Sequence, residues 1–141
     1  MRKGIVIFVI LFSVFFNYAE ELSQYALFFK TKYPKIYKNV FLKHATQKWS
    51  GNYSMIVFEI NRQTNALFEV VHEFNKDKST DNLYVLIRAI QKWSYDGYKE
   101  YNISLLNKKD FNAVDLFSLH CNWSMVLFEY RRQVQAKNLL K

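Results

Sequence analysis

Two segments of this chain, 70 residues apart, align without gaps. Residues 52–66 read NYSMIVFEINRQTNA and residues 122–136 read NWSMVLFEYRRQVQA, so eight of the fifteen positions are identical. A shorter match relates residues 45–52 (ATQKWSGN) to residues 89–96 (AIQKWSYD). Repeated supersecondary units usually stack and bury their apolar faces against one another. The common unit is therefore a segment that ends in Lys-Trp, a polar break that opens with Asn or Asp, and a second segment.

The apolar residues inside each unit follow a helical period. In the first copy they recur at the i, i+4, i+7 spacing of a buried helix stripe, at Ile56, Ile60, Leu67, Val71 and Phe74. Asn52, Asp96 and Asn122 are good N-cap residues for a second helix, and Ser79, Thr80 and Asp81 offer a choice of N-cap for another. Three Gly and one Pro are too few for the frequent turns of an all-β protein.

The sequence therefore predicts an all-α fold. We expect a short entry helix near residues 20–30 and three αα-hairpins over about 34–75, 79–107 and 109–140. The third unit keeps the second segment but has Leu119 where the Trp would stand. These hairpins are expected to form a single domain over residues 20–141, packed as a small bundle or a solenoid-like stack.

The first 19 residues have the pattern of a secretory signal peptide. Met1-Arg2-Lys3 precedes an apolar run over residues 4–16, and cleavage is expected after Ala19. The alternative is an uncleaved signal anchor. Export predicts a periplasmic or secreted protein. Cys121 is the only cysteine, so it is either buried or available for pairing between chains.

The identical positions of the two long segments fall mostly on one helix face. This face carries polar residues in both copies, Glu59, Arg62 and Gln63 in the first and Glu129, Arg132 and Gln133 in the second. The simpler interpretation is packing against the preceding helix, with Glu and Arg paired three residues apart and Gln bound to a backbone group. The alternative is a polar pocket in which a buried Glu acts as a general base or ligand.

No catalytic or metal-binding motif is recognisable. His44, His72 and His120 lack a metal-ligand spacing, and adjacent residues on a helix, such as His120 and Cys121, point in different directions. The chain also lacks a Gly-rich phosphate loop and a nucleophile elbow. We therefore predict a non-enzymatic protein with no cofactor and no metal.

A basic and aromatic segment covers residues 28–49, and it has no acidic residue. Its candidate surface consists of Lys30, Lys32, Tyr33, Lys35, Tyr37, Lys38, Lys43 and Lys48. Charge and stacking together suit anionic lipid or polysaccharide, whereas export argues against nucleic acid as a partner. The alternative is a solvated helix face whose aromatic residues belong to the core.

The break between the segments resembles a motif of small exported bacterial proteins. Here it reads KWSGNYSM over residues 48–55, and the motif is K-W-x-x-[DN]-[FY]-x-M followed by a Gln-containing helix. Those proteins often carry cysteines in both helices, whereas Ala45 and Ala89 stand at such positions here. The resemblance implies a helical hairpin fold and a bacterial source, and it implies no activity. Together these observations predict an exported module that binds a protein partner.

Overall fold

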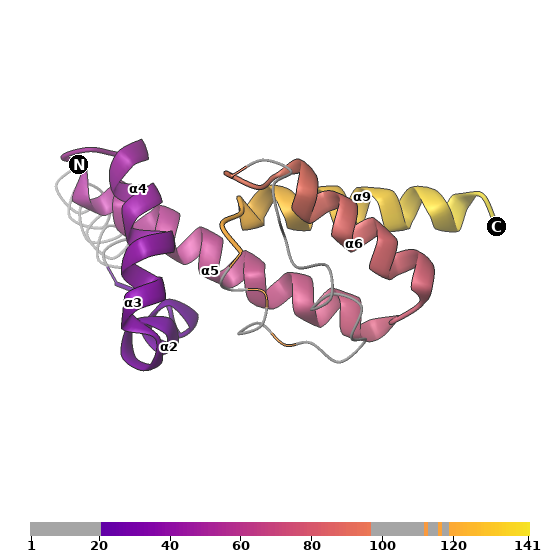
Figure 1. Cartoon of the computed structure of the whole chain (residues 1–141), viewed down its shortest axis with the longest axis horizontal. Coiled ribbons are helices and arrows are strands. Elements are labelled where there is room, and N and C mark those ends of the chain that lie inside the picture. The colour runs from indigo at the N-terminus through magenta and orange to yellow at the C-terminus, as the bar shows by residue number, and fades with distance from the viewer. Residues whose placement is uncertain (1–20, 97–111, 113–115, 117–118) are drawn as a thin grey trace, which may run out of the picture. The chain divides into compact units, whose positions relative to one another are not determined.

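The computed structural model describes residues 21–96, 112, 116 and 119–141 (Figure 1). The secondary structure elements named for these residues are all helices, so the all-α prediction is confirmed. In chain order they are α2 (Gln24–Lys32), α3 (Pro34–Ile36), the π-helix η1 (Tyr37–Leu42), α4 (Lys43–Lys48), α5 (Tyr53–Lys76), α6 (Thr80–Lys92) and α9 (Trp123–Leu139).

The chain divides into two compact units. The first, unit 1, ends at Asn61, and the second, unit 2, begins at Arg62, so the boundary lies within α5. Each unit is described by itself below. The prediction of a single domain over residues 20–141 stays a prediction.

In unit 1, α2 packs against α3 and η1. The Ser23 hydroxyl caps α2 by accepting a hydrogen bond from the Ala26 N–H at 3.2 Å. Pro34 occupies the first turn of α3, because that position needs no N–H donor. The core of this unit consists of small and aromatic side chains, Ala26, Phe29, Tyr37, Val40, Phe41, Ala45, Ile56 and Ile60.

The turn between α4 and α5 depends on a glycine. Gly51 has φ of 77°, a left-handed conformation that side chains with a Cβ disfavour. This turn lets the Asn52 N–H donate a hydrogen bond to the Trp49 carbonyl at 2.9 Å. The chain thereby reverses within two residues and α5 starts at Tyr53.

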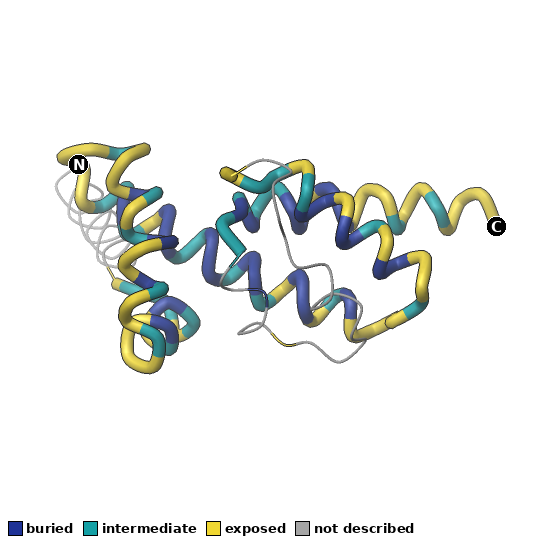
Figure 2. The backbone as a smooth tube through the Cα atoms, viewed as in Figure 1, coloured by how far each residue is buried: buried dark blue, intermediate teal, exposed yellow. Residues whose placement is uncertain are grey.

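In unit 2, the second half of α5, helix α6 and the first half of α9 bury their apolar stripes (Figure 2). α6 and α9 are in direct contact. Fully buried side chains of this unit include Leu67, Val70, Phe74, Leu86, Ile90, Trp123 and Val126. The last turn of α9 is exposed.

The predicted helix starts agree with the structure where it describes them. α6 follows the N-cap Ser79, and α9 follows the N-cap Asn122. The predicted signal peptide over residues 1–19 lies outside the described residues, as do residues 97–107 of the second predicted hairpin. Within the described part of the chain, no helix combines the length and the apolar character that a membrane span needs.

Candidate functional site

The Lys-Trp motif of the first repeat joins α4 to α5 through an ion pair and a cation–π contact. Lys48 is the last residue of α4, and its Nζ lies 3.4 Å from Glu59 Oε2 on α5. The same Nζ stands 5.5 Å from the centroid of the Trp49 ring, within cation–π range. The ammonium group therefore joins the indole ring to the buried carboxylate.

The second Lys-Trp motif makes the same two contacts between α6 and α9. Lys92 Nζ lies 3.3 Å from Glu129 Oε2 and 5.6 Å from the centroid of the Trp93 ring. The Trp93 carbonyl accepts a hydrogen bond from the Asn122 N–H at 2.9 Å, as the Trp49 carbonyl does from Asn52. Two segments far apart in the sequence, residues 91–93 and 122–129, thus reproduce the geometry of the first hairpin.

The two asparagines cap their helices in the same way. Asn52 Oδ1 accepts hydrogen bonds from the Met55 N–H at 3.2 Å and from the Ser54 hydroxyl at 3.0 Å. Asn122 Oδ1 accepts the corresponding bonds from Met125 at 3.4 Å and from Ser124 at 2.9 Å. The identity of Asn and Ser in both copies therefore has a structural cause, the unpaired N–H groups of a first helical turn.

This pairing changes the interpretation of the third repeat. The residue that stands before α9 in the role of Trp49 is Trp93, not Leu119. Just beyond the two segments 91–93 and 122–129, Ser94 and Cys121 form an antiparallel bridge. Sequence alignment alone does not reveal that the partner of α9 is α6.

Glu129 is held by several hydrogen bonds. Gln133 Nε2 donates to its Oε1 at 3.0 Å, and Arg132 Nη2 donates to both oxygens at 3.0 and 3.2 Å. These bonds, with that of Lys92, lower the pKa of the Glu129 carboxyl from 4.5 to about 2, although burial opposes the shift. The expected pairing of Glu and Arg three residues apart is present here.

The expected bond between a Gln and a backbone group is present at Gln63, although its partner belongs to α9 and not to the preceding helix. Gln63 Oε1 accepts a hydrogen bond from the Ser124 N–H at 3.3 Å, and its Nε2 donates to Asn122 Oδ1 at 3.0 Å. Glu59 and Gln63 are buried and Arg62 is half-buried. The structure thus gives these repeated polar residues packing and capping contacts.

The repeated phenylalanines depart from the expected packing face. Phe58 is 49% exposed and Phe128 is 58% exposed, so neither packs against the preceding helix as expected. Arg132 and Gln133 are also exposed, although they bind the carboxylate of Glu129. Only part of the shared face is therefore an internal contact.

The basic segment separates into exposed lysines and inward aromatic residues. All its lysines are exposed, namely Lys30, Lys32, Lys35, Lys38, Lys43 and Lys48. Tyr37 is buried, which raises the pKa of its phenol, and Tyr33 is half-buried. The alternative of a solvated lysine face over core aromatics describes most of this segment.

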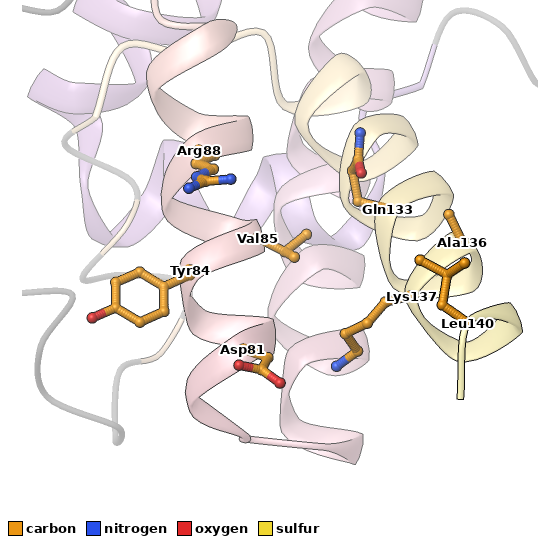
Figure 3. A pocket seen from close by; sticks show the side chains of 8 residues that line it. All are labelled: Asp81, Tyr84, Val85, Arg88, Gln133, Ala136, Lys137 and Leu140. Atoms are coloured by element: carbon orange, nitrogen blue, oxygen red, sulfur yellow. The ribbon is translucent and has the colours of Figure 1, made fainter.

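An open groove lies between α6 and α9 (Figure 3). Its volume is about 490 Å³, and its lining consists of Asp81, Tyr84, Val85 and Arg88 from α6 and Gln133, Ala136, Lys137 and Leu140 from the end of the chain. Figure 3 shows Val85 and Lys137 in the space between the two helices. Lys137 Nζ also binds Asn82 Oδ1.

Most of the residues that line this groove were not predicted from the sequence. Tyr84 is 61% exposed on a helix whose neighbouring residues Leu83 and Leu86 are buried. An aromatic residue on the polar side of an amphipathic helix is the signal that would have identified it. Asp81 and Arg88, also on α6, form no ion pair with any other described residue.

His120 and Cys121 each contact a different partner. His120 Nδ1 lies 3.5 Å from Asp96 Oδ2, and the Cys121 thiol is buried with its Sγ 3.8 Å from the Ile90 carbonyl oxygen. Residues 21–96 and 119–141 contain no cluster of His, Cys, Asp and Glu side chains arranged for a metal ion.

Comparison with protein-family models, with curated proteins and with solved structures found no match for this chain.

Proposed function

We propose that this chain is an exported, non-enzymatic helical-repeat protein that binds a polypeptide partner in the cell envelope or periplasm. The observation that carries the proposal is the open groove between α6 and α9 (Figure 3). Export is supported by the basic start and the apolar run over residues 4–16. A helical hairpin as the repeated unit belongs to the same proposal and is supported by the repeated sequence.

The groove suits a peptide because it combines apolar and charged contacts. Tyr84, Val85 and Leu140 supply apolar surface, and exposed aromatic residues are frequent anchors in protein interfaces. Asp81 and Arg88 stand two helical turns apart on α6 and have opposite charges. A bound peptide would gain two oriented charge contacts along the groove.

The site chemistry favours binding over catalysis. Glu129 has a pKa of about 2 and is therefore a weak base at neutral pH. Glu59 is buried and bound by Lys48. These carboxylates hold helices together, so a hydrolase that uses either residue as a general base has less support.

Site-specific photo-crosslinking tests the proposal. A photoreactive amino acid replaces Tyr84 in the groove or, as the control, Tyr53, which is 81% exposed in unit 1. Each protein is irradiated in an envelope extract of the source organism and washed at low and then high salt. We expect a discrete protein adduct from position 84 alone. No adduct at position 84, or the same adduct from both positions, would contradict the proposal.

A further inference from the structure

Unit 1 carries a strong and nearly uncompensated positive charge. Residues 21–61 contain six lysines and only two carboxylates, Glu21 and Glu59, which gives a formal charge of +4. Glu59 is bound by Lys48. The other five lysines are exposed and form no ion pair with a described residue, and we call them the lysine face: Lys30, Lys32, Lys35, Lys38 and Lys43.

The π-helix η1 helps to gather part of this face. A π-helix closes its hydrogen bonds from residue i to i+5 and so has more residues in each turn than an α-helix. Lys38 lies within η1, Lys35 precedes it and Lys43 follows it. The wider turn brings Lys43 toward the side of Lys35, and the buried Tyr37, Val40 and Phe41 face the core.

Several aromatic rings of the segment pack against one another. The rings of Phe28 and Phe29 lie 5.4 Å apart and those of Phe29 and Phe41 lie 5.5 Å apart, measured between centroids. Proteins that hold nucleic-acid strands stack exposed aromatic rings on the bases, and a stacking site of this kind needs free ring faces. Buried Phe29, Tyr37 and Phe41 do not provide them.

We infer that the lysine face binds the surface of an anionic bilayer through lipid headgroup phosphates. Exposed lysines beside buried or half-buried aromatic rings recognise charge density, and an anionic leaflet supplies it over a wide area. This attraction requires neither insertion of a helix nor a pocket. The inference is independent of the α6–α9 groove, which lies in unit 2.

Vesicle co-sedimentation of the full chain tests this inference. The vesicles contain phosphatidylcholine with phosphatidylglycerol, and the test variant is the triple substitution K35E, K38E and K43E. The control is the triple substitution K76E, K78E and K141E in unit 2, which changes the net charge equally and leaves the α6–α9 groove residues intact. A second test variant with glutamine at positions 35, 38 and 43 serves if the glutamate variant misfolds, as judged by circular dichroism.

We expect the glutamine variant to bind the anionic vesicles roughly 100-fold more weakly and the glutamate variant more weakly still, because each lysine near such a surface strengthens binding about fivefold. The control variant should bind within about threefold of the unchanged protein, and salt should weaken all binding through screening. Equal losses in the test and control variants, or no loss in either, would overturn the inference. Tighter binding to dextran sulfate than to the vesicles would also overturn it and would indicate a polysaccharide ligand.

Discussion

Replacing Glu129 by Gln removes the carboxylate that joins α6 to α9 and keeps the side-chain shape. A pKa lowered from 4.5 to about 2 corresponds to about 3 kcal/mol of stabilisation. Solvent screening reduces this value, because the side chains of Lys92 and Arg132 are 52% and 55% exposed. We therefore expect Glu129→Gln to lower the free energy of unfolding by about 1–2 kcal/mol at pH 7.

The loss should depend on pH in a defined direction. The folded pKa of Glu129 lies below the unfolded value, so its stabilisation is complete above about pH 4.5 and disappears as the pH falls toward 2. Urea unfolding followed by far-UV circular dichroism measures both proteins at a series of pH values. The difference in the free energy of unfolding between them should shrink over this interval, because a protonated Glu129 resembles Gln.

Glu69→Gln is the matched control for the same experiment. Glu69 pairs with Arg131 at 2.9 Å, but both side chains are 49% exposed. Its loss should therefore cost at most about 0.5 kcal/mol. Equal costs for the two substitutions at pH 7, or a cost of Glu129→Gln that persists unchanged near pH 2, would refute the reasoning.

Two further substitutions test the remaining parts of the repeat. Asn122→Ala should cost about 1–2 kcal/mol in urea unfolding and Asn52→Ala about 1 kcal/mol, because Asn122 also accepts a hydrogen bond from Gln63; equal costs would argue against that contact. Phe128→Ser should change the free energy of unfolding by less than about 0.5 kcal/mol, whereas Trp123→Ala should cost about 3–5 kcal/mol, since Phe128 is exposed and Trp123 is fully buried. A large loss with Phe128→Ser would show that this residue packs after all.

Local structure was predictable because helix-forming rules act over a few residues. The N-caps Ser79 and Asn122, the first-turn Pro34 and the apolar stripe of α5 are all readable from neighbours along the chain. The repeated Glu and Gln residues make helix contacts, but the partner of Gln63 is the first turn of α9 and not the preceding helix that the packing interpretation named.

The sequence was less informative about which helices pack together. Sequence alignment located both Lys-Trp motifs. Their spacing alone, however, paired the second motif with the residues directly after it. In the structure Lys92 and Trp93 contact α9 across the connection 94–121. Contacts between residues far apart in sequence depend on how the whole chain packs, and a repeat pattern does not show where a turn has been lengthened.

Local pattern in this sequence therefore determined the all-α class, the capped helix starts and the residues that recur in each copy. Tertiary structure decided which recurring residues are buried, since Glu59 and Glu129 face lysines while Phe58 and Phe128 face solvent. It also formed the groove beside Tyr84 by placing α9 along α6. The physical reason is that helix formation depends on hydrogen bonds and side chains a few residues apart, whereas burial and clefts arise only when separate helices meet.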